Sequence, residues 1–290
     1  MNQQIKKVII AGGSGHFGHI LTQELVRTGK YIVSILQRKN STVDDRKKAL
    51  LEMGVGCIST DYNNPDELLN AVREADIVIS TLSDMAVMEQ RKLLEACKDA
   101  TVSRFIPAEF TTDVSALGGP FYGPKRDFRL MMKEYNDKYG MEYIFYINGP
   151  FMEDLVGMNP NFLIKEKKAI IVGNGNDSRM VATSMRDVAR FVVASFDRPD
   201  MKNRQLTFWG DYMTLNEYLA KYETRFGKFD VEYISMEEAQ KAINQENPFA
   251  TVMEYFRVSI AKGDYDLPHN DNGLFPEIKP LSFEEFLECC

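Results

Sequence analysis

The chain has 290 residues, 44% of them hydrophobic, which is enough to bury one large core or two closely joined ones. Its formal charge of -7, with Lys and Arg scattered along the chain, argues against a nucleic-acid-binding surface. No apolar run approaches the length of a membrane span, and the four cysteines have the spacing of neither a zinc site nor a disulfide framework. We therefore expect a cytoplasmic protein that binds no metal.

The first predicted element is an apolar strand over residues 7–11, which leads directly into a glycine-rich turn and an amphipathic helix over residues 19–26. Glycines at such spacing allow a tight turn, close approach of the backbone to phosphate, and packing of the helix on the strand. The backbone amides at the start of the helix would face a dinucleotide pyrophosphate. The alternative is an ordinary glycine-rich turn. The residues of the predicted dinucleotide turn are Gly12, Gly13, Ser14, Gly15, His16, Phe17 and Gly18.

A second strand is predicted over residues 31–36, and the residues at its end indicate which dinucleotide binds. Proteins that bind NAD usually have an acidic residue here, on the ribose hydroxyls, whereas this chain has none between residue 31 and Asp44. Arg38 lies twenty positions after Gly18, where a cation can meet the 2'-phosphate of NADP. We therefore predict NADPH/NADP+ as the cofactor. The alternative is that Arg38 is one of two solvated cations at the mouth of a loop.

Strands and helices continue to alternate as far as about residue 150. Right-handed crossovers between such short elements produce a doubly wound parallel sheet with helices on both faces. We therefore expect an α/β protein whose residues 1–150 form a Rossmann-type domain. Ser80, Thr81, Leu82 and Ser83 would lie at the carboxyl edge of its sheet, where ligands bind. Strands are predicted over 55–60, 77–80, 104–107 and 143–147, and helices after Asn64 and over 88–97 and 125–139.

Residues 151–290 have a different pattern. Helical signals dominate there, and the strands predicted over 169–172, 205–208 and 231–234 are short and separated. Two Ser-x-x-Glu segments, at 235–238 and 282–285, have the pattern of capping boxes, which open helices. We expect a smaller, mostly helical α+β region that packs against the nucleotide-binding domain and covers the substrate.

The strongest catalytic candidate is Lys125, in a helix predicted to begin at Pro124. A surface lysine would normally lie on the side of its helix opposite the apolar face, but Lys125 lies on the apolar face itself. A partly buried lysine near a helix N-terminus and the carboxyl edge of the sheet is suited to exchanging a proton near neutral pH. The alternative is a lysine with a buried stem and a solvated ammonium group. The apolar stripe continues at Phe128, Met132, Tyr135 and Tyr139.

Several segments together resemble one protein family. Their order along the chain is similar to that of the atypical short-chain dehydrogenases, and in particular to their NmrA-like, isoflavone reductase-like branch. The Arg-Phe-Ile-Pro-Ala-Glu-Phe segment at 104–110 is the most specific part, because many Rossmann proteins share the glycine turn. The segments that carry the resemblance are the glycine turn, Arg38, residues 76–81, residues 104–110, Lys125 and residues 148–151.

The resemblance implies NADPH-dependent hydride transfer to a conjugated or benzylic carbon, or to a carbonyl group, of a small-molecule substrate. It also implies that Lys125 assists proton transfer and that Arg38 binds the 2'-phosphate. Gly12, Gly15, Gly18 and Phe17 would hold the pyrophosphate, while Ser80 and Thr81 would border the ribose or nicotinamide. The remaining implied site residues are Pro107, Glu109 and Phe110 in the active-site wall, and Asn148, Pro150 and Phe151 facing the nicotinamide.

The sequence also departs from the pattern of these enzymes. Ordinary short-chain dehydrogenases carry Tyr-x-x-x-Lys, but here Phe121 lies four residues before Lys125, and Tyr122 is one position off. Lys125 would then act alone or through water. Thr111 replaces a glycine, and Asp127 replaces a residue that is often basic in this branch. The missing tyrosine leaves a second hypothesis open, in which the protein is a catalytically silent NADP(H)-sensing regulator of the NmrA type with a protein partner.

Overall fold

The computed structural model describes residues 5–83 and 86–290, and these residues divide into two compact units. The first unit contains the described residues up to residue 109, residues 114–146 and residues 189–206. The second unit contains residues 110–113, 147–188 and 207–290. The segment 189–206 therefore packs with the first unit, although the sequence placed it in the region after residue 150. The functional boundary at residue 150 stays a prediction.

A five-stranded parallel sheet lies at the centre of the first unit, in the order β3-β2-β1-β4-β5. The strand order reverses at β1, which is a topological switch point. Ala11 is paired with both Leu36 and Ser80, so the carboxyl ends of three strands meet at one edge. The predicted Rossmann-type α/β class is thereby confirmed. The strands are β1 (Lys6–Ala11), β2 (Tyr31–Arg38), β3 (Gly56–Thr60), β4 (Ile77–Ser80) and β5 (Arg104–Ile106).

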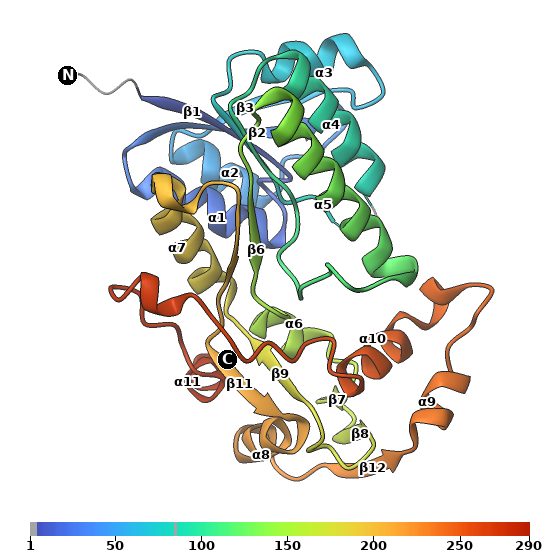
Figure 1. Cartoon of the computed structure of the whole chain (residues 1–290). Coiled ribbons are helices and arrows are strands. Elements are labelled where there is room, and N and C mark those ends of the chain that lie inside the picture. Colours follow the sequence, from blue (N-terminus) through green and yellow to red (C-terminus); the bar gives the residue numbers. More distant parts are fainter. Residues whose placement is uncertain (1–4, 84–85) are drawn as a thin grey trace. The chain divides into compact units, whose positions relative to one another are not determined.

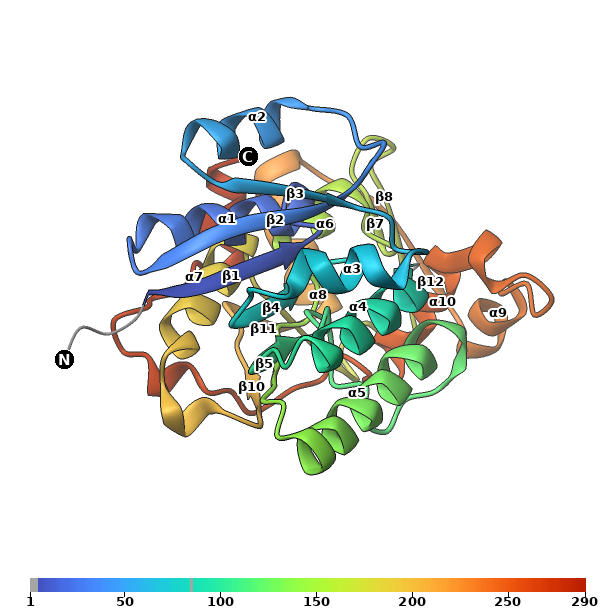
Figure 2. The ribbon, with the colours of Figure 1, turned by 90° about the horizontal axis from the view of Figure 1, so that it is seen from above.

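Helices cover both faces of this sheet (Figures 1 and 2). Helices α1 (His16–Arg27) and α2 (Asp45–Glu52) lie on one face, and α3 (Pro65–Val72), α4 (Val87–Asp99) and α5 (Gly119–Tyr139) lie on the other. Helix α3 begins as predicted, since the Asn64 side chain accepts a hydrogen bond from the Glu67 N–H at 3.2 Å. The sequence analysis missed α2, because only Lys47 and Leu50 of this helix are buried and its apolar periodicity is weak.

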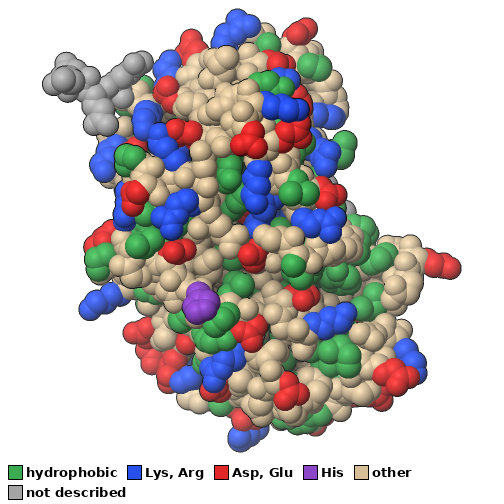
Figure 3. Space-filling model, in the orientation of Figure 1, with side chains coloured by type: hydrophobic (Ala, Val, Ile, Leu, Met, Phe, Trp, Pro, Cys, Tyr) green, Lys and Arg blue, Asp and Glu red, His purple; other side chains and the backbone are tan. Residues whose placement is uncertain are grey.

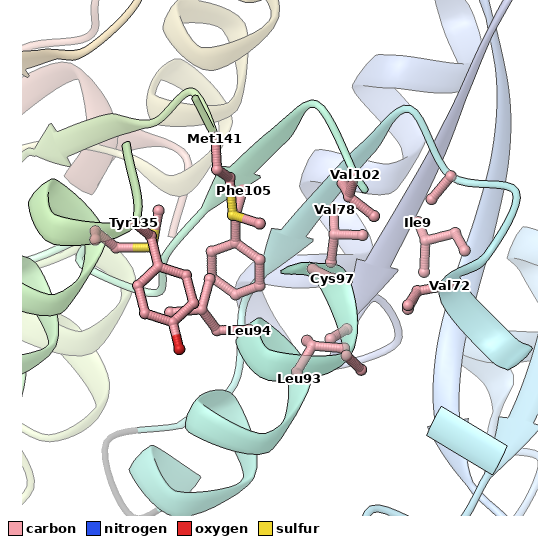
Figure 4. Packing of buried hydrophobic residues seen from close by; sticks show 14 of the residues in the cluster. Ile9, Val72, Val78, Leu93, Leu94, Cys97, Val102, Phe105, Tyr135 and Met141 are labelled. Carbon is pink, nitrogen blue, oxygen red and sulfur yellow. The ribbon is translucent and has the colours of Figure 1, made fainter. Parts of the chain in front are cut away.

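The core between the sheet and helices α3 to α5 is built from continuous apolar runs (Figure 4). All four residues of β4 are buried, as expected for a parallel strand covered on both faces. Val78 and Phe105 from the sheet pack with Leu93 and Cys97 of α4, all of them completely buried. This packing fixes the position of the strand ends that carry the candidate site.

Helix α5 differs from its prediction in one respect. It begins at Gly119 rather than at Pro124, because Pro120 occupies its first turn, where a missing N–H costs no hydrogen bond. Pro124 lies inside the helix and has no N–H for the carbonyl four residues earlier. Lys125 is therefore in the second turn. The predicted apolar stripe is present from Lys125 to Tyr135, but Tyr139 is 57% exposed.

The predicted sixth strand exists as β6 (Ile144–Ile147), but it does not extend the five-stranded ladder. It pairs instead with β10 (Arg204–Thr207). The segment just before β6 is linked to β5 by an isolated bridge between Arg104 and Glu142. In addition, the Phe105 N–H donates a hydrogen bond to the Glu142 carbonyl at 2.9 Å. Both Arg104 and Lys202 bond to the Glu142 carboxylate, which ties residues 189–206 to the first unit.

The second unit combines short strands and helices, as predicted. Its strands form one sheet in the order β12-β8-β7 and one β11-β9 pair. Both predicted capping boxes are present, and a third, from Thr214 and Glu217, opens α8. Helix α7 runs from this unit into the first. The elements are α6 (Met152–Gly157), β7 (Phe162–Leu163), β8 (Lys168–Val172), β9 (Arg179–Ala182), α7 (Met185–Phe196), β11 (Asp211–Thr214), α8 (Leu215–Phe226), β12 (Asp230–Ile234), α9 (Met236–Lys241), α10 (Val252–Ala261) and α11 (Phe283–Glu288).

The surface carries charges of both signs. On the face drawn in Figure 3, Lys and Arg side chains are interspersed with Asp and Glu. Of the helices in the described part of the chain, none combines the length and the apolar character needed to span a bilayer.

Candidate functional site

The glycine turn lies between β1 and α1, at the carboxyl edge of the sheet. Gly12 has a φ of +78°, and its carbonyl accepts a hydrogen bond from the Gly15 N–H at 2.8 Å. A Cβ atom at Gly18 would lie 2.2 Å from the Gly12 carbonyl oxygen and 2.5 Å from Thr81 Oγ1. Helix α1 can therefore approach the strands only because residue 18 has no side chain.

The first turn of α1 has no side chain that neutralises its positive end. Its N-cap is Gly15, no side-chain cap bond is made, and the first turn contains no acidic residue. Gly15 and His16 are exposed, whereas Gly13 and Phe17 are buried. The exposed helix terminus is suited to an anion such as a pyrophosphate.

A cavity of about 590 Å³ opens beside this turn. Its walls come from the end of β2, from the segments that follow β1, β2, β3 and β4, and from α4, so it lies at the switch point of the sheet. Four of the predicted site residues, Gly12, Ser14, Arg38 and Leu82, line it. Ser83, which was expected at the carboxyl edge of the sheet, lines it as well. The described lining residues that the sequence analysis did not select as site residues are Leu36, Gln37, Asn40, Ser41, Thr42, Tyr62, Ala86 and Glu89.

Arg38 and Glu89 are the charged residues of this lining. The Arg38 side chain is 67% exposed, and its Nη2 lies 3.4 Å from Glu89 Oε1. Such an exposed contact is weak, so the guanidinium can exchange it for a phosphate. Glu89 comes from α4, 51 residues after Arg38, which is why spacing along the strand and loop could not reveal it.

Tyr62 contributes a buried hydroxyl to the same cavity. The residue is 6% exposed, and its hydroxyl oxygen has no hydrogen-bond partner among the described residues. Burial raises the pKa of the Tyr62 phenol well above its ordinary value of 10, so the phenol stays protonated at neutral pH. A polar ligand in this cavity would supply the missing partner. The sequence signal for Tyr62 is its position two residues after the end of β3.

Lys125 belongs to a second cluster of buried residues in the first unit. It lies in α5 and contacts Glu109, which comes three residues after the end of β5. It is 8% exposed, and its Nζ donates a hydrogen bond to the Glu109 carbonyl oxygen at 2.9 Å. The Glu109 carboxylate accepts a hydrogen bond from Arg129 Nη2 at 2.6 Å, and both side chains of this ion pair are at most 3% exposed. The sequence analysis missed Arg129, although its position four residues after Lys125 on one helix face was a usable signal.

Residues 107–109, which lead into this cluster, form a tight turn. The Glu109 N–H donates to the Pro107 carbonyl at 2.8 Å, and the Ala108 N–H donates to Gln90 Oε1 at 2.8 Å. Phe110, which follows, has a φ of +30°, a conformation that residues other than glycine rarely adopt. Backbone of this kind persists only where its surroundings hold it in place.

The other predicted residues take different positions. Ser80 and Pro107 are buried and do not line the cavity, and the Thr81 hydroxyl donates to the Ala11 carbonyl at 2.9 Å. In the second unit, the Asn148 N–H donates to the Thr111 carbonyl at 3.0 Å. Thr183 Oγ1 donates to the Asn148 carbonyl at 2.8 Å. Thr183 also holds the next residues of this turn, since its N–H donates to the Pro150 carbonyl and it forms a β-bridge with Phe151.

The fold and the cavity together define a Rossmann-type protein with an open pocket at its topological switch point. The NmrA-like family model matches residues 4–287, and the chain belongs to this family. The resemblance inferred from the sequence is thereby confirmed.

Known proteins of the same family are similar over their full length. The chain is 28% identical to "Probable pinoresinol-lariciresinol reductase 3" and 24% identical to "Isoflavone reductase homolog P3", both of Arabidopsis thaliana, and each match covers 99% of both chains. Its structure is similar to one titled "AtPrR2 with NADP+ and (+)pinoresinol", with a TM-score of 0.84 and 22% identity over 99% of both chains.

Proposed function

We propose that the protein is an NADPH-dependent reductase that transfers hydride to a small conjugated, aromatic or carbonyl substrate. Lys125 is the proton donor or relay. The observation that carries this proposal is the buried Lys125 ammonium, bonded to a carbonyl just after β5 in the same unit as the open cavity. The names of the relatives given above, an isoflavone reductase homolog and a probable pinoresinol-lariciresinol reductase, support the substrate class.

The residues of the cavity fit NADPH. The turn would admit a pyrophosphate because Gly12 lines the cavity, Gly15 and His16 are exposed, and the start of α1 carries no competing carboxylate. Arg38 would hold the 2'-phosphate through a charge-assisted hydrogen bond. Tyr62 would donate its hydroxyl hydrogen to a polar atom of the nucleotide. When bound, NADPH supplies the hydride.

Lys125 would complete the reaction by moving a proton. Its ammonium group carries three N–H donors and donates a hydrogen bond to the Glu109 carbonyl. In the proposed reaction the ammonium group would give a proton to the substrate oxygen or carbon that gains negative charge, directly or through a water molecule. Phe121, at the position of the usual tyrosine, has no hydroxyl to share this role.

A single-turnover assay of NADPH oxidation, run with conjugated ketones and aromatic ethers as substrates, tests the proposal. Replacing Lys125 with alanine should slow hydride transfer by about 10²- to 10⁴-fold and leave the NADPH dissociation constant unchanged. Lys125→Arg is the matched control, because it keeps the positive charge at residue 125 but replaces the ammonium group with a guanidinium group. Normal turnover by Lys125→Ala would remove the proposed role of Lys125.

Measurements of NADPH and NADP+ binding and of NADPH oxidation on the same protein distinguish this function from redox sensing. A reductase should bind NADPH and NADP+ comparably and oxidise NADPH when given a suitable acceptor. Strong selection of one redox state, together with no turnover across the substrate panel, would favour the sensing regulator instead.

A further inference from the structure

We propose that Arg129 is a positioning residue for Lys125, because the buried Arg129–Glu109 ion pair holds the Glu109 carbonyl where it receives the Lys125 ammonium. This inference rests on the proposed function, in which Lys125 moves the proton. Arg129 itself has no place in the proton transfer.

The ion pair between Arg129 and Glu109 is almost completely buried, and a gain in stability does not by itself explain such a pair. The Arg129 and Glu109 side chains are 3% and 2% exposed, and their closest atoms are 2.6 Å apart. Replacing such a pair by apolar residues is often neutral or stabilising, because desolvation of the two charges offsets their attraction. A role in placing other atoms accounts better for its presence.

Further contacts fix the Arg129 guanidinium. Its Nη1 donates to Ser115 Oγ at 2.6 Å and to Gln205 Oε1 at 2.9 Å, and its central carbon lies 4.8 Å from the centre of the Phe145 ring. These partners come from two separate segments of the first unit, residues 114–146 and 189–206. The guanidinium is thus a rigid anchor for the Glu109 carboxylate.

Helix α5 contacts Glu109 at two points. Lys125 and Arg129 are four residues apart, so they lie on one face of the helix, one turn from each other. Lys125 bonds to the backbone carbonyl of Glu109, and Arg129 bonds to its carboxylate. If the contact between Arg129 and the Glu109 carboxylate were lost, the Glu109 carbonyl could move. The Lys125 ammonium group would then lose its fixed position.

The turn that contains Glu109 needs such an anchor. Phe110 has a φ of +30°, which an unrestrained chain would relax to a common conformation. The Gln90 side chain holds this turn on one side through the Ala108 N–H, and Arg129 holds it on the other. Without Arg129, we expect the peptide after Glu109 to rotate and the carbonyl to leave Lys125.

The test combines Arg129→Met with the conservative variants Arg129→Lys and Glu109→Gln. Arg129→Met should lower the single-turnover rate of NADPH oxidation by up to about 10²-fold, the loss expected from a misplaced catalytic group, with NADPH affinity retained. Arg129→Lys and Glu109→Gln, which keep one hydrogen bond of the pair, should restore part of the rate. A parallel loss of rate and NADPH affinity, or a rate equal to that of the parent protein, would overturn the proposal.

A second readout does not depend on catalysis. An amine-reactive reagent followed by peptide mass spectrometry measures how fast the Lys125 ammonium reacts. Lys47, which is 4% exposed and lies in α2, is the internal control. Release of Lys125 from Glu109 should speed its labelling in Arg129→Met while Lys47 stays slow. Faster labelling of both lysines would indicate general loosening and overturn the proposal, as would unchanged labelling of Lys125. Lack of turnover by the parent protein would contradict the proposed function but leave this labelling test decisive.

Discussion

Gly18→Ala is the sharpest perturbation of the glycine turn. The added methyl group would lie 2.2 Å from the Gly12 carbonyl oxygen, a backbone atom that cannot rotate away. To reach ordinary contact distance, α1 must move away from the strands by roughly 1 Å. Overpacking of this kind costs about 1–3 kcal/mol, of which the better helix propensity of alanine returns up to about 1 kcal/mol. With that full return subtracted, the first unit should lose up to about 2 kcal/mol of stability.

The same shift should act more strongly on NADPH binding than on stability. It moves the exposed N–H groups at the start of α1, and loss of a hydrogen bond to a charged group costs about 1.5–3 kcal/mol. We expect the NADPH dissociation constant to rise by about 10- to 100-fold in a fluorescence titration, with a lower midpoint in thermal unfolding.

Gly123→Ala is the matched control. Gly123 lies inside α5, and the nearest atom to its added Cβ is 4.0 Å away, so the same change meets no obstacle. It should stabilise the protein by up to about 1 kcal/mol and leave NADPH affinity unchanged. Equal unfolding midpoints and equal NADPH affinities for the two variants would refute the packing argument.

Four further predictions concern single side chains. Arg38→Ala should weaken NADPH binding by about 10- to 100-fold and leave NADH binding almost unchanged, and equal weakening of both in the titration would show that Arg38 does not bind the 2'-phosphate. Glu89→Gln removes the carboxylate 3.4 Å from Arg38 and should tighten NADPH binding by up to about 5-fold, whereas weaker binding would contradict this. Asn64→Ala should lower the free energy of unfolding by about 1 kcal/mol through loss of the α3 cap, measured by urea denaturation, with NADPH affinity as the control that must not change. Burial acts to raise the pKa of Glu142, but hydrogen bonds from Lys202 and Arg104 outweigh it and leave the pKa below its ordinary value of 4.5. The folded state therefore favours the Glu142 carboxylate, whose stabilisation is present above pH 4.5 and disappears as the pH falls through the lowered pKa. The stability difference between the parent protein and Glu142→Gln should shrink over that range in acid titrations, and a constant difference would exclude this role.

The sequence determined the features that depend on neighbouring residues. A cap bond joins Asn64 and Glu67, three residues apart, and the Ser-x-x-Glu boxes and the glycine turn are equally local. The buried strands were predictable because a strand covered on both faces is continuously apolar. The burial of Lys125 followed from its place on the helical stripe. The start of α5 was missed because Pro120 and Pro124 are both acceptable first-turn residues, and only the packed chain distinguishes them.

The tertiary structure decided which distant residues meet. Glu89 reaches Arg38 across 51 residues, and Arg129 reaches Glu109 across 20. The place of Tyr62 in the wall of the cavity likewise requires β3 to lie beside β2. Such contacts are set by how helices dock on the sheet, which depends on the shapes of many buried side chains at once. No local pattern contains that information, so the sequence could indicate the glycine turn and the burial of Lys125, but not the side chains that surround them.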